Sequence, residues 1–163
     1  MLRPLALLAT LAASIPVGPA LALTCVPPDP IQSFRMAHEA PESYVVLHGR
    51  LDVDASRFPD GVEAVPPGAA ETLLDPVEGR FRGFALGLAG FTTPVDATVL
   101  LHPQCFGQFC GRIGPGDGWL LFARPSGTGL YAVTVDPCGA WAFDGVAQAT
   151  LDTLAECLRG RAC

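Results

Sequence analysis

The chain contains no lysine, so all ten of its basic residues are arginine. Sixteen acidic residues outnumber them, and the net charge at pH 7 is −6. An acidic chain has little with which to neutralise a phosphate backbone or the headgroups of anionic lipids. The charge balance therefore argues against nucleic acid and anionic membrane surfaces as partners. We interpret the missing lysine, beside abundant alanine, glycine and proline, as the mark of a GC-rich bacterial genome.

Recognisable catalytic motifs are also missing. The sequence has no Gly-x-Ser-x-Gly, His-Glu-x-x-His, P-loop or Rossmann glycine pattern. His48 falls in a predicted strand and His38 near a predicted helix end, where structural roles are commoner than catalysis. We therefore expect no catalytic residue, no cofactor and no enzymatic activity. The alternative is a small secreted enzyme whose site is assembled from scattered residues.

The apolar stretch at the start of the chain is too short to span a bilayer. It runs from Leu5 to Ile15 after the positive charge of Arg3, and small residues occupy positions −3 and −1 before Leu23. This arrangement is typical of a secretory signal peptide. We expect residues 1–22 to be cleaved, leaving residues 23–163 as a single exported domain, secreted or periplasmic.

A retained membrane anchor and a lipoprotein are the alternatives to cleavage. Three prolines within the leader would break a spanning helix. Thr24 occupies the position before Cys25 where lipid-attachment signals require a small residue. We therefore expect no membrane insertion after cleavage.

All six cysteines follow the leader. An even number in an exported chain favours three disulfides, although the residues alone leave the pairing open. A metal site around His102, Cys105 and Cys110 is the alternative, but the spacing of these two cysteines does not fit a zinc knuckle. We expect no bound metal.

Local patterns predict a mainly β chain between two helices. Asp29 before Pro30 is typical of a helix start, and Pro41 ends that helix. Asp144 is the expected cap of the second helix, which closes at Gly160. Residues 55–79 and 102–118 are expected to be long loops, the first with at most a short strand near residues 70–74; the predicted strands span residues 44–53, 80–91, 95–101, 119–123 and 130–135.

Five strands with glycine bends and no βαβ alternation favour a closed or partly closed barrel over an open sheet. The glycines of the 80–91 strand predict strong coiling or close backbone approach. We predict a five-stranded Greek-key barrel of the OB-fold type, with an N-terminal helical segment, a C-terminal helix and stabilising disulfides. A β-sandwich is the alternative, but about seven strands would be needed and are hard to find.

Two stretches of the sequence resemble netrin-like domains, and most closely the tissue inhibitors of metalloproteinases. The first is Thr24-Cys25-Val26-Pro27-Pro28, followed by a helix and the strand at residues 44–50. The second begins at Cys110-Gly111 and passes through two strands and a hairpin to Cys138. The resemblance implies a divergent, bacterial OB-fold domain that recognises another protein.

The resemblance also implies the cysteine pairing. In the family, the second cysteine of the opening pair bonds the cysteine that follows the hairpin. The family's first cysteine is replaced here by Leu23. The cysteine that would have been its partner, Cys110 in this chain, is then available to pair with Cys105. The last two cysteines then close the C-terminal tail. The implied disulfides are Cys25–Cys138, Cys105–Cys110 and Cys157–Cys163.

We expect a monomeric, non-catalytic recognition module whose partner is a basic or neutral protein, with a peptidase as one candidate. In the inhibitors, the amine and carbonyl of the first cysteine chelate the zinc of the target protease. The alternative function is therefore inhibition of a metallopeptidase through the amine of Leu23. Trp119 heads an apolar strand, and we expect it in the core. The expected binding edge joins the N-terminal segment 23–28 to the loop 105–118, and the contact residues expected in it are Leu23, Thr24, Val26, Phe106 and Phe109.

Overall fold

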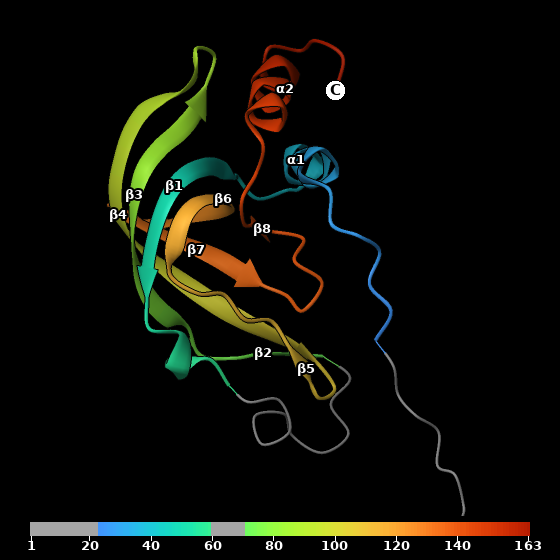
Figure 1. Ribbon diagram of the computed structural model, residues 1–163, viewed down its shortest axis with the longest axis vertical. Coiled ribbons are helices and arrows are strands. Elements are labelled where there is room, and N and C mark those ends of the chain that lie inside the picture. The colour runs from blue at the N-terminus through green and yellow to red at the C-terminus, as the bar shows by residue number, and fades with distance from the viewer. Residues whose placement is uncertain (1–22, 60–70) are drawn as a thin grey trace, which may run out of the picture.

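The structure is a computed structural model that describes residues 23–59 and 71–163 (Figure 1). The expected signal peptide lies outside the described residues, as does the centre of the predicted 55–79 loop. The described chain is mainly β, with two α-helices, one eight-stranded sheet and three disulfides.

The first helix, α1 (Pro30–Glu39), forms where the sequence predicts it. The carboxylate of Asp29 accepts a hydrogen bond from the backbone amide of Ile31 at 2.9 Å, which satisfies one amide that the helix leaves free. Pro30 occupies the first helical position and lacks an amide hydrogen, so it loses nothing there. The helix ends before Pro41, as expected.

The strands pair in the order β1-β3-β4-β7-β6-β8, β1 also pairs with β6, and β2 and β5 pair with β4. The β4–β7 pair is parallel, and the other pairs are antiparallel. The strands are β1 (Val45–Val53), β2 (Glu71–Leu73), β3 (Val77–Gly87), β4 (Gly90–Phe106), β5 (Phe109–Cys110), β6 (Gly116–Gly127), β7 (Leu130–Val135) and β8 (Ala142–Phe143).

Eight strands occur in the described residues, where five were predicted and a short strand was allowed near residues 70–74, which β2 matches. The predicted 80–91 strand contains the turn between β3 and β4, at residues 88–89. The predicted 102–118 loop was wrong at both ends, because β4 continues to Phe106 and β6 already begins at Gly116. Strand β4 persists because β2 and β5 supply hydrogen-bonding partners for its last residues.

The sheet buries apolar side chains on both of its faces. Successive residues of a strand point to opposite faces. Leu47 and Leu51 of β1 accordingly pack into one cluster with Phe81, while Val46 packs into a second cluster with Phe122. Helices α1 and α2 cover the second face and lie beside each other (Figure 1).

Helix α2 (Gln148–Leu158) starts later than predicted and ends as predicted. The expected cap Asp144 was wrong, because Gly145 turns the chain with a φ of 61° and Ala147 precedes the first turn without a side-chain cap. At the other end, Gly160 has a φ of 73°, and its amide donates to the carbonyl of Cys157 at 3.0 Å. This left-handed glycine cap satisfies carbonyls that the helix end leaves free.

Gly49 of β1 and Gly83 of β3 lie opposite each other, where the two backbones come very close. A Cβ built on Gly83 would lie 2.3 Å from the carbonyl oxygen of His48, and one built on Gly49 would lie 2.3 Å from that of Arg82. Only glycine fits such a contact, so the close approach predicted for this strand is confirmed at Gly83.

Replacing Gly83 with alanine should therefore lower the free energy of unfolding by about 1–3 kcal/mol, the usual cost of overpacking. Gly87→Ala is the matched control on the same strand, because its Cβ would lie 3.8 Å from the nearest atom. The control should change stability by less than about 0.5 kcal/mol. Urea denaturation of both oxidised variants measures the difference, and equal losses would contradict this account.

His48 provides a second stability test. Its ring contacts the edge of the Phe91 ring, with centroids 5.6 Å apart, and burial lowers its pKa. The unfolded chain then binds a proton at a higher pH than the native chain does. Stability should fall as the pH drops from about 6.5 towards the folded pKa. His48→Gln should show a weaker dependence over that interval, and denaturation at stepped pH would reject the assignment if both slopes match.

Candidate functional site

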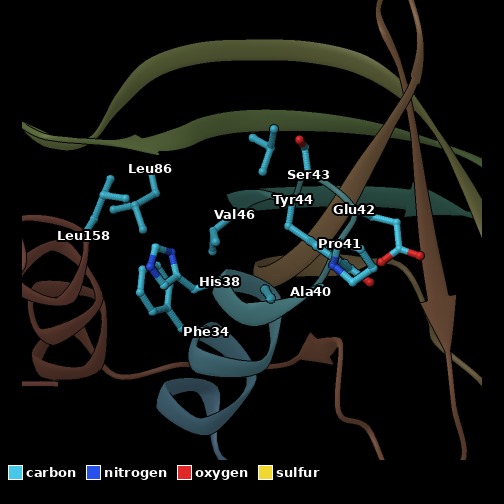
Figure 2. Close-up of a pocket in the computed structure, with 12 residues that line it drawn as sticks. Phe34, His38, Ala40, Pro41, Glu42, Ser43, Tyr44, Val46, Leu86 and Leu158 are labelled. Atoms are coloured by element: carbon cyan, nitrogen blue, oxygen red, sulfur yellow. The ribbon is translucent and has the colours of Figure 1, made fainter.

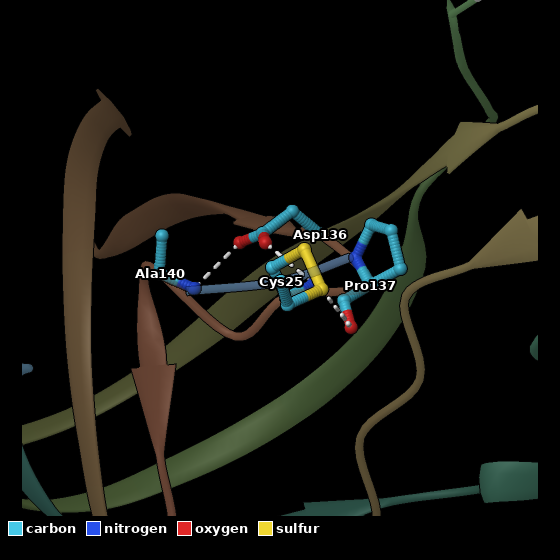
Figure 3. The surroundings of a disulfide bond; sticks show 5 residues. Cys25, Asp136, Pro137 and Ala140 are labelled. Atoms are coloured by element: carbon cyan, nitrogen blue, oxygen red, sulfur yellow. Dashed lines mark hydrogen bonds between the residues drawn. A yellow bond between two sulfur atoms is a disulfide. The ribbon is translucent and has the colours of Figure 1, made fainter. Parts of the chain in front are cut away.

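The N-terminal segment is fastened to the turn that follows β7. Cys25 forms a disulfide with Cys138, 113 residues away in sequence. The carboxylate of Asp136 accepts hydrogen bonds from the amides of Cys138 at 2.9 Å and Ala140 at 2.8 Å (Figure 3). Gly139 closes the turn with a φ of 74° and donates to the carbonyl of Asp136 at 3.2 Å. Hydrogen bonds at Cys138, Gly139 and Ala140 therefore hold the turn to which Cys25 is bonded.

A second disulfide closes the hairpin between β4 and β5. Cys105 and Cys110 stand directly opposite each other on the two strands, and the Cys105 side chain is fully buried. Phe106 and Phe109 form the next opposed pair, and Gly107 turns the chain with a φ of 56°. This cystine hairpin (residues 105–110) holds Phe109 in a fixed position.

Gly111 allows the chain that leaves the cystine hairpin to pack closely against the end of β7, next to the turn that holds Cys138. A Cβ on Gly111 would lie 1.9 Å from the carbonyl oxygen of Val135, the last residue of β7. Asp136 follows directly, so the hairpin's return strand packs on the backbone that leads into the anchoring turn. The amide of Gly111 also donates to the carbonyl of Gln104 at 2.9 Å. Both disulfides are thereby held on the same end of β7.

A groove of about 410 Å³ runs between these two anchored segments. Leu23 lines it from the N-terminal side and Phe109 from the hairpin side. The described part of its lining is mostly apolar, and Arg112 is the single charged residue among the described residues that line it. The described residues that line this N-terminal groove are Leu23, Cys25, Pro59, Gln108, Phe109, Cys110, Arg112 and Pro137.

The five residues of the expected binding edge are not all in this groove. Leu23 and Phe109 line it, whereas Thr24 and Val26 are exposed beside it and do not. Phe106 is half-buried on the neighbouring strand. Trp119 is half-buried and packs against the main core cluster.

Besides the two cysteines, four of the described lining residues are not among the five residues named for the expected edge, although Gln108 and Arg112 lie within its expected 105–118 loop. Pro137 adjoins Cys138 and Arg112 adjoins Gly111, so the paired motifs could have suggested both. Gln108 lies in the turn of the cystine hairpin. Pro59 comes from a distant segment, and no sequence pattern connects it to the others.

A second hollow, of about 400 Å³, lies beneath α1 (Figure 2). Phe34 and His38 of α1 stack with ring centroids 6.3 Å apart and face Leu86 and Leu158. Glu42 lies at its opposite end. The sequence offered no signal for this hollow, since its walls come from four separate elements, α1, β1, β3 and α2, and from the segment between α1 and β1.

Neither hollow contains an evident catalytic pair. Within residues 23–59 and 71–163, no histidine is hydrogen-bonded to a serine or threonine hydroxyl, and every cysteine is in a disulfide. No group of three His, Cys, Asp or Glu side chains in this part of the chain could hold a metal ion. No helix in it is long and apolar enough to cross a bilayer. What the N-terminal groove offers is a rigid, mostly apolar contact surface.

Comparison of the chain with family models, curated proteins and solved structures found no match. The chemistry of the groove and the pairing of the strands are therefore the grounds for a functional assignment.

Removing the long disulfide should destabilise the protein most. The loop-entropy model gives about 4–5 kcal/mol for a loop as long as the one that Cys25–Cys138 closes. Replacing both cysteines with alanine should cost about that much. Replacing Cys157 and Cys163, separated by six residues, should cost only about 2 kcal/mol. Guanidinium denaturation ranks the two double variants, and the reverse ranking would contradict the model.

Proposed function

We propose that this chain is an exported recognition module that binds a protein partner through the N-terminal groove. The observation that carries the proposal is that Leu23 and Phe109, from opposite parts of the sequence, line one groove. Disulfides hold the segments of both residues. A rigid surface loses little conformational entropy on binding, which favours recognition.

We further propose that five strands form a Greek-key barrel of the OB-fold type, related to netrin-like domains. The pairing order β1-β3-β4-β7-β6 supports this, because β1 also pairs with β6 and the path returns to its first strand. The parallel β4–β7 pair is the crossing that such an order requires. Strands β2, β5 and β8 would then be extensions of this barrel.

The disulfides also support the proposal of export. Disulfides form and persist mainly in oxidising compartments, and this chain has three among its described residues. The leader at residues 1–22 would direct the chain there. In the periplasm or outside the cell, an acidic module would meet basic or neutral partners with the least electrostatic penalty.

Site-specific crosslinking tests the recognition surface. A photoreactive phenylalanine at position 109 should give a discrete adduct with one protein in envelope extract from the producing cell. The same residue at position 88 is the control, because Leu88 is 71% exposed on the β3–β4 turn, away from the groove. Adducts should also disappear when Cys25 and Cys138 are both replaced, since the groove then loses one wall. Equal labelling from positions 88 and 109, or none from 109, would contradict the proposal.

A second candidate is inhibition of a zinc metallopeptidase by the amine of Leu23. It is favoured by one observation: Leu23 is 37% exposed, lines the groove and lies two residues from the Cys25 disulfide. That disulfide would limit the entropy lost when the amine binds a metal.

Protein that begins at Leu23 should then inhibit at least one member of a panel of secreted zinc metallopeptidases. Protein with one additional residue before Leu23 should not, because its amine is displaced. Inhibition constants measured for both forms decide the matter. Equal inhibition by the two forms, or none by either, would remove this candidate and leave the recognition proposal intact.

A further inference from the structure

Arg124 differs from the other arginines in the described part of the chain. It is half-buried and forms no hydrogen bond or ion pair there. An unpaired guanidinium that is partly withdrawn from water is unusual in a protein with excess carboxylates. The other described arginines each take part in a hydrogen bond, ion pair or electrostatic interaction: Arg35, Arg50, Arg57, Arg80, Arg82, Arg112, Arg159 and Arg161.

The sheet makes a hollow beside Arg124. Arg124 of β6 stands directly opposite Ala132 of β7, which in turn pairs with Leu100 of β4. These three residues form a row across neighbouring strands, and the middle one has the short side chain of alanine. Ala132, although itself 8% exposed, lines the hollow together with Arg124 of β6 and His102 of β4.

This hollow, of about 470 Å³, is lined by several polar groups, of which Glu42 and Ser43 also line the hollow beneath α1. His102 reaches it from β4 and Ser126 from β6. Glu42 and Ser43 reach it from the segment between α1 and β1, and Figure 2 shows the side chain of Glu42 extending away from Phe34 and His38. None of the four forms a hydrogen bond or ion pair with a described residue. The hollow shares no residue with the N-terminal groove.

The charges of the hollow define its ligand. A guanidinium presents a planar fork that matches a carboxylate, and imidazole and hydroxyl groups can add hydrogen bonds. Glu42 would repel a simple anion and attract an ammonium group. The net charge of the chain, −6, also disfavours simple anions at longer range. A ligand that carries one carboxylate and one ammonium group satisfies both Arg124 and Glu42.

We propose that the hollow around Ala132 binds a small zwitterion of the amino-acid or short-peptide class. Its carboxylate lies against Arg124, with His102 and Ser126 as further donors, and its ammonium group faces Glu42. A volume of this size is within the usual range for small-molecule sites. The site is independent of the proposed recognition groove, and either can fail without the other.

Titration of the oxidised, leader-free chain with four probes tests the proposal. L-alanine and L-alanyl-L-alanine are the zwitterions, and acetate and methylammonium each carry one of the two charges. The NMR signals of His102 and of the Arg124 side chain should shift saturably with at least one zwitterion, and more weakly with the single ions. Comparison of the two zwitterions distinguishes a free amino acid from a short peptide. No saturable shift with either zwitterion, or acetate binding as tightly as both, would overturn the proposal.

Substitutions test the assigned roles. Arg124→Ala should weaken zwitterion binding at least about tenfold, the usual loss for a hydrogen bond to a charged group. Arg124→Lys should retain part of the affinity, since it keeps the charge but loses the fork. Glu42→Gln should weaken zwitterion binding and strengthen acetate binding. Arg80→Ala, which breaks an exposed ion pair with Asp96, is the control and should bind normally. Unchanged affinity in a folded Arg124→Ala protein would overturn the proposal.

Discussion

The disulfide between Cys25 and Cys138 determines where residues 23–29 lie. A segment rich in proline has few interactions of its own, so a covalent bond is what holds it against the rest of the fold. The same turn that holds the disulfide also holds α1, because the buried hydroxyl of Ser33 donates to the carbonyl of Ala140 at 2.6 Å. Ala140 in turn donates to Asp136. One short turn therefore positions both the N-terminal groove and the helix that covers the sheet.

The helices are needed because the sheet is apolar on both faces. A sheet that buried only one face could leave the other to water, but here Leu120 and Phe122 of β6 face the helix side and are almost fully buried. Alternate residues of the same strand, such as Leu121 and Ala123, fill the inner core. The tight contact between Gly49 and Gly83 lets the strands bend around that core. The curvature of the sheet, the packing of its inner face and the helices on its outer face therefore all serve to bury apolar side chains.

The sequence predicted the elements that depend on local chemistry and missed those that depend on distant pairing. Asp29 and Gly160 act within a few residues of their own positions, so the ends that they define could be recognised. Asp144 is a typical capping residue as well, but it does not cap α2 because the chain turns at Gly145 before the helix begins. The last residues of β4 are in a strand because β7 pairs with residues 102–103 and β2 and β5 pair with residues 104–106, and no local pattern in these residues predicts such distant partners.

The residues of the candidate site also divide into those that the sequence could identify and those that depend on the tertiary fold. Leu23 and Phe109 could be named because a family resemblance connected their cysteines to the same part of the fold, and the three disulfides join the pairs that the resemblance implied. Pro59 could not be named, because it meets them only through the tertiary fold. Arg124 was missed for another reason: its significance depends on the absence of a partner, and a sequence does not show which charges are paired.

The short disulfides have a different role from the long one. A loop of five or six residues loses less entropy when it is closed than a long loop does, so its contribution to global stability is smaller. Cys105 is nevertheless fully buried, and its bridge fixes Cys110 and hence the wall of the groove. Opening this bridge would free Phe109 while the core clusters on both faces of the sheet stayed packed. The geometry of the groove can therefore depend on oxidation more strongly than the stability of the fold does.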